Sequence, residues 1–256
     1  MGFLNSQMRR QHRGDVMGSD VNNTPFSVDN KLIEVQNRIR EDFGFGLEDD
    51  LNSAYLLSKK VMGGISTEDS INDIRARLST YEEVVVMGAA VEPEDLSCLD
   101  DDFCLIAADG SVGVLNELEN THSQDMWQRL ALVVSDADGG AAIIDAAKRN
   151  IPFALHAHGD NIDAWNELLP TLLAEGITIL PTHQCPTLVN NMVNPGGFTD
   201  GDRAVCLVKA MGIENITLVG FTTSEIGRWT GRTDPVRKMR KLKWMAEVLG
   251  TLGFEV

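Results

Sequence analysis

At 256 residues the chain is long enough for one large core, or for a core with a smaller appendage. Hydrophobic residues make up 43% and charged residues 23%, a globular composition that excludes wholesale disorder. The 38 acidic and 22 basic side chains give a net charge of −16, which repels nucleic-acid backbones and anionic membranes. We therefore expect no nucleic acid and no membrane as partners, although a divalent cation could still join a polyanion such as ATP to this acidic protein.

The cysteines and the apolar segments predict the compartment. The four cysteines show no CxxC spacing and fall in or beside apolar runs, so we expect buried thiols in a reducing compartment. They are Cys98, Cys104, Cys185 and Cys206. No run has the length of a signal peptide or approaches the ~20 apolar residues that span a bilayer. A cytoplasmic location is the expectation, and a homo-oligomer is left open.

The first part of the chain is polar and then helical. Residues 1–28 carry few apolar side chains and are predicted to form a mobile N-terminal arm. In residues 29–80 apolar side chains recur at helical spacing, and Ser66 is expected to cap the last of these helices. We predict a small helical N-terminal region over 29–80, followed by an α/β catalytic domain over 81–256.

The second part alternates short apolar runs with helical segments. The runs are 83–88, 103–108, 131–135, 153–157, 177–180 and 216–220. Because they are apolar throughout, they suit strands that are covered on both faces. The predicted fold class is therefore α/β, a Rossmann-like, mostly parallel sheet flanked by helices.

Titratable residues follow several of these strands. Asp109 comes after the second run, Asp136 and Asp138 in "SDADGG" after the third, and "HAHGDN" closes the fourth. Ligands bind outside the carboxyl ends of the strands in open α/β sheets, so these residues should converge on one edge. Clustered carboxylates repel one another unless a hard cation lies between them, which predicts Mg²⁺. The alternative for Asp136 and Asp138 is an acidic turn with a helix cap. The equivalent position of Asp109 after the preceding strand favours the metal site.

The histidines of "HAHGDN" permit two further interpretations. An HxH pair on a strand sends both rings to one face, as in zinc hydrolases, but no other strand end supplies a clear nitrogen or sulfur ligand. Two histidines satisfied within the core are the structural alternative, which the following Gly-Asp-Asn weakens. We interpret His156 and His158 as hydrogen-bond donors to phosphate or substrate.

The segment "NPGGFTDGDRAV" places flexible backbone and acid before an apolar helix. Its glycines allow close backbone approach, and the helix start offers free amides to a phosphate group. Thr199 or Asp200 can cap the helix, and because a cap needs only one residue, a carboxylate remains available to bind a metal. How Asp200 and Asp202 divide these roles is open, and Arg203 could bind phosphate or pair with a local aspartate.

Basic residues gather near the C-terminus, and two of them precede a helix. Arg228 and Arg232 in "IGRWTGR" are candidates for contact with a triphosphate. The basic residues from Arg237 onward are interpreted as the solvated face of an amphipathic helix.

Taken in order, "AADGS", "VSDADG", "HAHGDN", "NPGGFTDGDRAV" and "ITLVG…IGRW" resemble the archaeal 6-hydroxymethyl-7,8-dihydropterin diphosphokinase family, over roughly residues 81–245. The acidic motifs are also distantly similar to those of thiamin pyrophosphokinases. The resemblance implies Mg²⁺-dependent transfer of diphosphate from ATP to the hydroxymethyl group of the pterin, with release of AMP, in folate or tetrahydromethanopterin biosynthesis. Two positions depart from the family: "GAAVEPED" replaces a glycine-rich turn after the first strand, and Phe221, Thr222 and Thr223 replace an acidic residue.

These arguments give three sets of site residues. The predicted catalytic residues are Asp136, Asp138, His158 and Asp202. The predicted metal ligands are Asp136, Asp138, Asp200 and Asp202. The predicted substrate and phosphate contacts are Asp109, Gly110, His156, Asp160, Asn161, Gly196, Gly197, Thr199 and Arg203. Two other hypotheses are kept: a phosphatase with Asp136 as nucleophile, and a nucleotide-binding module of the same fold without the reaction.

Overall fold

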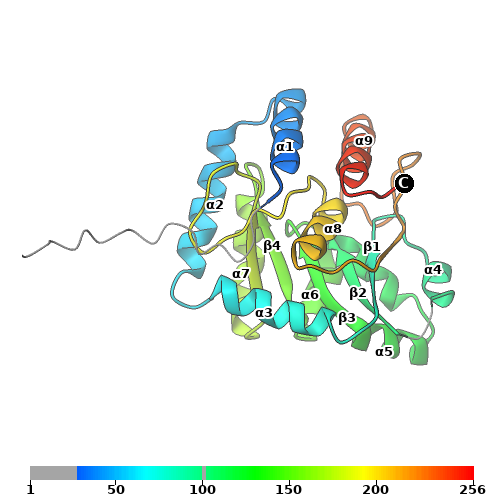
Figure 1. The fold of residues 1–256 in the computed structure, drawn as a ribbon. Helices are drawn as coiled ribbons and strands as arrows, with labels where there is room; N and C mark the ends of the chain where they lie inside the picture. Colours follow the sequence, from blue (N-terminus) through cyan, green and yellow to red (C-terminus); the bar gives the residue numbers. More distant parts are fainter. Residues whose placement is uncertain (1–27, 100–101) are drawn as a thin grey trace, which may run out of the picture.

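The computed structural model describes residues 28–99 and 102–256 and contains one sheet of six parallel strands in the order β5-β4-β3-β2-β1-β6 (Figure 1). The strands are β1 Glu83–Met87, β2 Phe103–Ala108, β3 Leu130–Ser135, β4 Phe153–Ala157, β5 Ile179–His183 and β6 Ile216–Val219. Every predicted apolar run contains or overlaps one of them, and every pairing is parallel. The predicted fold class is confirmed.

Helices precede, connect and follow the strands. Their bounds are α1 Asn30–Phe43, α2 Leu47–Val61, α3 Thr67–Leu78, α4 Pro93–Ser97, the 3-10 helix η1 Asp109–Asn116, α5 Asn120–Arg129, α6 Gly140–Lys148, α7 Ile162–Ala174, α8 Asp200–Ala210 and α9 Pro235–Thr251. Ser66 caps α3 through its side chain, as the sequence predicts. Apart from Val28, the predicted N-terminal arm lies outside the described residues.

Helices cover both faces of the sheet because both faces are apolar. On one face, side chains such as Val85 and Met87 pack with α2, α4, α5, α6 and α7. On the other, Val84 and Val86 pack with α3, α8 and α9. The helices α2 and α3 of the 29–80 region thus share their core with the sheet.

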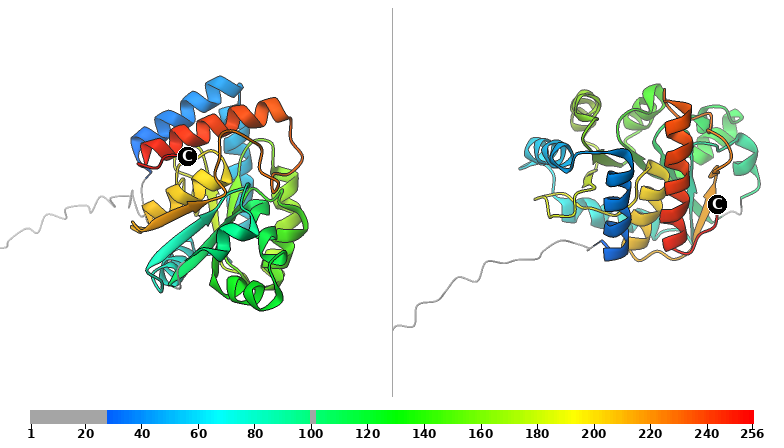
Figure 2. Two further views of the ribbon diagram at one scale, coloured as in Figure 1. Left: turned by 90° about the vertical axis from the view of Figure 1, so that its right-hand side faces the viewer. Right: turned by 90° about the horizontal axis from the view of Figure 1, so that it is seen from above.

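The first helix lies against the last one. Leu32, Val35 and Ile39 of α1 form a smaller apolar cluster with Cys206 of α8 and Val248 of α9. Figure 2 shows α1 and α9 side by side, above α8. Gly44 ends α1 in the left-handed conformation at a φ of 69°, which turns the chain sharply toward α2. This turn reaches the carboxyl edge of the sheet, where it contributes Phe43 and Phe45 to the site described below.

The order of the strands creates a topological switch point. The chain adds β2 to β5 on one side of β1 and then returns to place β6 on the other side. The turns after β1 and β6 touch there, since the Ala90 amide donates to the Gly220 carbonyl over 2.9 Å. A side chain at Gly220 would place its Cβ 2.1 Å from the Val91 nitrogen. Ligand sites form beside such a switch point.

The cysteine prediction holds for three of the four thiols. Cys104, Cys185 and Cys206 are buried, whereas Cys98 is exposed. Cys98 follows the five-residue helix α4, where the chain turns at the surface. Within 28–99 and 102–256, no helix combines the length and the apolar character needed to span a bilayer.

Candidate active site

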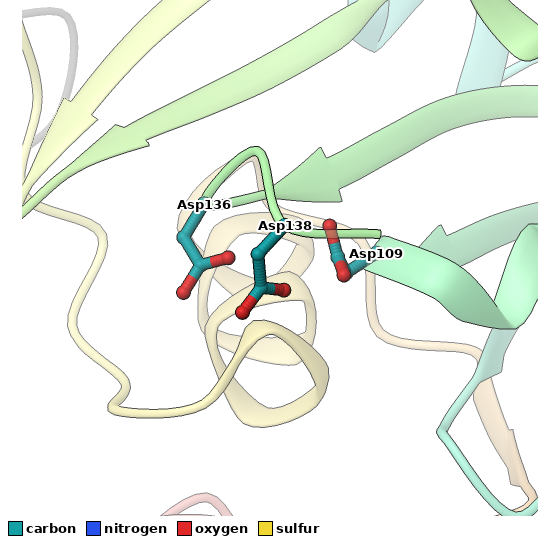
Figure 3. Close-up of side chains that lie close together, drawn as sticks. All are labelled: Asp109, Asp136 and Asp138. Carbon is teal, nitrogen blue, oxygen red and sulfur yellow. The ribbon is translucent and has the colours of Figure 1, made fainter. Parts of the chain in front are cut away.

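Three aspartates from two neighbouring strand ends form an acidic cluster (Figure 3). Asp109 begins η1 directly after β2, and Asp136 and Asp138 lie in the turn after β3. Each offers one carboxylate oxygen, and these three oxygens lie within 4.8 Å of one another. The convergence expected from the sequence is therefore present in the fold.

The backbone of the cluster adopts unusual conformations. Asp109 has a φ of 49° and Ala137 a φ of 79°, in the left-handed region that side chains other than glycine rarely adopt. Ser135 fixes both turns, because its hydroxyl donates to Asp109 Oδ1 over 2.5 Å and accepts from the Ala137 amide over 2.9 Å. Gly139 leaves room for the carboxylate: a Cβ there would lie 2.8 Å from both Asp109 oxygens.

The cluster brings together acidic groups that repel one another. Burial, together with the charges of Asp200, Asp136 and Asp138, raises the pKa of Asp109 well above its usual value. Burial also raises the pKa of Asp138, and it raises that of Asp200 to about 7. Asp136 Oδ1 is buried and has no hydrogen-bond partner in the described part of the chain. An all-oxygen donor set with an unpaired buried carboxylate oxygen fits a hard divalent cation such as Mg²⁺.

His158 lies between two carboxylates at the border of this cluster. Its Nε2 lies 3.2 Å from Asp136 Oδ2 and its Nδ1 lies 2.6 Å from Asp160 Oδ1. Burial alone would lower the pKa of His158, but the hydrogen bonds to Asp136 and Asp160 raise it to about 9. The imidazole is therefore a charged donor at neutral pH and not a free base.

His156 and Asn161 support this arrangement from behind. His156 is fully buried, its Nδ1 lies 3.0 Å from Thr182 Oγ1, and burial holds its pKa well below the usual value. The Asn161 amide nitrogen donates to the carbonyls of Asp136 and His156 over 2.8 and 2.7 Å, and its oxygen accepts from the His158 amide over 2.9 Å. Neither residue lines the cavity described below, so their predicted substrate contacts find no support in this geometry.

The start of α8 separates the roles of its two aspartates. Thr199 is the N-cap and forms a capping box with Asp202. Both Asp202 oxygens serve the cap: Oδ2 accepts from the Phe198 amide over 2.8 Å and Oδ1 from the Thr199 amide over 2.7 Å. Asp200 instead turns toward the acidic cluster and raises the pKa of Asp109. Asp202 therefore caps the helix, and Asp200 lies beside the acidic cluster.

The other predicted contacts around α8 serve packing. Gly196 and Gly197 have φ values of 90° and 82°, and a Cβ on Gly197 would lie 2.5 Å from the Arg203 Cα. Arg203 is buried, and its Nη1 donates to Asp200 Oδ1 over 3.0 Å, the local pairing that the sequence left open. Gly110 packs against the Trp229 carbonyl. None of these four residues lines the cavity over the acidic cluster, although Gly110 lines a second hollow beside it.

A cavity of about 480 Å³ opens over the acidic cluster. Among the predicted residues, its lining includes Asp109, Asp136, Asp138, His158, Asp160, Thr199 and Asp200. Sequence reasoning missed two groups in the same lining. Basic residues of α9 contribute Arg237, Lys238 and Lys241, and aromatic residues contribute Phe43, Phe45 and Phe198.

The two arginines before α9 differ in position. Arg228 pairs with Glu92 over 3.0 Å, also pairs with Glu117, and does not line this cavity. Arg232 does line it. The expectation that the basic residues from Arg237 onward form only a solvated face is wrong for Lys238 and Lys241, which are half-buried in the cavity wall. Their spacing of three residues puts both on one side of the helix, a signal that was present in the sequence.

An all-parallel sheet with an acidic cluster and an adjoining cavity at its carboxyl edge defines an α/β protein with a candidate ligand site at the edge where such sheets bind ligands. No protein-family model matches the chain. Three curated proteins, however, are similar to the chain over most of its length. The chain is 35% identical to the 6-hydroxymethyl-7,8-dihydropterin pyrophosphokinase of Pyrococcus furiosus over 83% of this chain and 88% of the relative. It is 32% identical to that of Methanothermobacter thermautotrophicus over 84% and 90%, and 30% identical to that of Methanocaldococcus jannaschii over 72% and 76%. The chain belongs to the 6-hydroxymethyl-7,8-dihydropterin pyrophosphokinase family.

Proposed function

We propose that this protein transfers the diphosphate of ATP to the hydroxymethyl group of 6-hydroxymethyl-7,8-dihydropterin, giving the pterin diphosphate and AMP. The names of the relatives support the acceptor and the reaction type. The observation that carries the proposal is the cluster of Asp109, Asp136 and Asp138 facing a cavity whose other wall is basic. A polyphosphate substrate requires both walls, because some of its oxygens bind basic side chains directly and others bind the aspartates through a metal ion.

The metal in this proposal is Mg²⁺, held by Asp109, Asp136 and Asp138 with Asp200 nearby. The unpaired, buried Oδ1 of Asp136 supports this assignment, since a buried carboxylate oxygen without a donor calls for a cation. When bound, the ion neutralises charge on the phosphate oxygens during transfer.

The reaction forms one phosphorus–oxygen bond and breaks another. The hydroxyl oxygen of the pterin attacks the β-phosphorus, the bond from that phosphorus to the oxygen bridging the α-phosphate breaks, and AMP leaves with the electron pair. The hydroxyl proton passes to solvent water as the new bond forms, and a loose transition state needs alignment more than a strong base. Both N–H groups of His158 already face Asp136 and Asp160, so in this scheme the charged ring fixes these carboxylates and adds positive charge beside the phosphates.

The proposal is tested by the nucleotide product. Purified protein is incubated with ATP, Mg²⁺ and the dihydropterin alcohol, and the nucleotides are separated by chromatography. AMP formed in proportion to the pterin consumed supports it. ADP, or phosphate released from a monoester without ATP, would point to a kinase or a phosphatase instead.

Matched variants then connect the reaction with the cluster. Asp136→Asn should lower kcat/KM by at least about 100-fold, because it removes a charge that holds the cation beside the transition state. Asp163→Asn is the control, since this carboxylate is exposed on α7 and lies outside the cavity lining. Equal activity of the two variants would contradict the role of the cluster.

A further inference from the structure

The cavity wall opposite the acidic cluster is one face of α9. Lys241 follows Lys238 by three residues and Arg237 by four on this helix, and all three line the cavity, as do Leu242 and Met245 further along. Figure 1 shows α9 above the carboxyl edge of the sheet, beside α1. The apolar members, Leu242 and Met245, pack with α8 in the core.

No acidic partner neutralises these three cations. Across the described ranges, none of Arg237, Lys238 and Lys241 forms an ion pair, whereas Arg240 of the same helix pairs with Asp42 over 2.6 Å. Burial and the charge of Lys238 together lower the pKa of Lys241, which shows that the cations are crowded and partly desolvated. Unpaired positive charge of this kind is unexpected on a solvated face of a chain with a net charge of −16.

Aromatic rings hold the cations in place. The guanidinium of Arg237 lies 5.3 Å from the ring centre of Phe45, and Lys241 Nζ lies 5.5 Å from that of Phe198. Phe45 in turn stacks on Phe43 at 5.2 Å, with the ring planes 5° apart. Arg240 covers the other end of this stack at 4.7 Å from Phe43. Such contacts orient cations without neutralising their charge.

The basic and acidic walls face each other without touching. The negative charges of Asp136 and Asp160 favour the charged form of Lys241. The positive charge of Lys238 likewise favours the charged forms of Asp138 and Asp200. No nitrogen of either lysine lies within salt-bridge distance of these carboxylates. A ligand in this gap must offer negative charge to α9 and, through a cation, to the aspartates. A chain of linked phosphates meets both requirements.

We propose that Lys238 and Lys241, with Arg237, form the binding site for the polyphosphate chain of the nucleotide, which lies between α9 and the aspartate cluster. The inference deepens the proposed function and rests on it for the identity of the nucleotide. The turn after α1 and the segment before α8 contribute indirectly to this site, because Phe45 orients Arg237 and Phe198 orients Lys241.

The test measures binding without turnover. Isothermal titration calorimetry in the presence of Mg²⁺ follows the binding of tripolyphosphate and of a non-hydrolysable ATP analogue to the full chain. The Lys238→Met/Lys241→Met variant is compared with the wild type and with Lys243→Met, which removes an exposed lysine of α9 outside the cavity lining. Circular dichroism and thermal unfolding confirm that each variant is folded, and Lys238→Arg/Lys241→Arg tests whether charge alone restores binding.

We expect the double methionine variant to bind both ligands at least about 10- to 100-fold more weakly, as the loss of charge-assisted hydrogen bonds predicts. Lys243→Met should bind like the wild type, and the arginine variant should recover most of the affinity. Unchanged affinity of the double methionine variant, or a wild type that binds neither ligand, would overturn the inference. A wild type that binds tripolyphosphate through these lysines but does not transfer diphosphate to the pterin would leave the inference standing and contradict the proposed function.

Discussion

His158 Nε2 lies 3.2 Å from Asp136 Oδ2, so the side chain that follows β4 is joined to the one that follows β3. Asp160 holds the other nitrogen of the same ring over 2.6 Å. A histidine held in this way cannot turn away from the cluster, and its charge offsets one of the carboxylates of the site.

The first prediction concerns the charge of His158. Its pKa is raised to about 9 in the folded protein, above the ordinary value of about 6.5, so the protonated form stabilises the fold. That contribution is complete below about pH 6.5 and is lost as the pH rises through about 9. Nitrogen NMR of the imidazoles of the metal-free protein should show His158 titrating near pH 9. A midpoint near 6.5 would show that the two carboxylates do not hold the proton.

The second prediction separates the two aspartates of α8 by function. Asp202→Ala should destabilise the protein by about 2 kcal/mol, because the capping box and the hydrogen bonds to two half-buried amides are lost. Asp200→Asn should cost less stability, since it removes a charge from a repulsive cluster while its amide oxygen can still accept from Arg203. Chemical denaturation without metal measures both. If Asp200→Asn proves the more destabilising, the assignment of the cap to Asp202 fails.

The third prediction links metal binding with pH. Burial raises the pKa of Asp109 and raises that of Asp200 to about 7, so these groups hold protons that a cation must displace. The metal-free fold is stabilised where they are protonated, and this contribution is lost as the pH rises through the raised pKa values. The affinity for Mg²⁺ should therefore be higher at pH 8 than at pH 6. Calorimetry in buffers of different ionisation enthalpy should detect proton release at pH 6, and an affinity independent of pH would contradict the prediction.

The fourth prediction concerns Asn161, which contacts the backbone of both site loops. Asn161→Ala leaves the carbonyls of Asp136 and His156 without their donor, and should destabilise the fold by about 1–3 kcal/mol. Because the residue positions others, kcat should fall more than the KM for either substrate rises. Asn161→Asp retains the oxygen that accepts from the His158 amide but not the donor, so it should not restore activity. Full activity in either variant would show that the loops hold their shape without this side chain.

The sheet was predictable because its strands are apolar on both faces. The acidic edge followed from it, since Asp109, Asp136 and Asp138 come directly after strands. β5 was predicted over 177–180 but extends to His183, because the polar Thr182 and His183 are buried within it. Burial of polar groups by tertiary contacts, such as that of Thr182 with His156, leaves no periodic signal.

The spacing of Lys238 and Lys241 indicated that they share one side of a helix, but the local pattern did not indicate that this side faces the cavity. The helix over Pro235–Thr251 reads as amphipathic, but Val236 of its expected apolar face is 79% exposed, while Lys241 is directed into the cavity. The ring beside Arg237 is Phe45 in the turn after α1, nearly 200 positions earlier in the chain, and the ring beside Lys241 is Phe198, which precedes α8. Such contacts depend on how α1 and α9 pack and not on the spacing of residues within either helix.

The central claim is that the β-phosphorus of ATP is attacked by the pterin alcohol beside the aspartate cluster. The most direct test uses ATP with oxygen-18 in the position that bridges the α- and β-phosphates, followed by phosphorus NMR of the products. We predict that the label leaves with AMP and that the unlabelled diphosphate appears on the pterin. Label in free pyrophosphate, or ADP as the nucleotide product, would contradict the account.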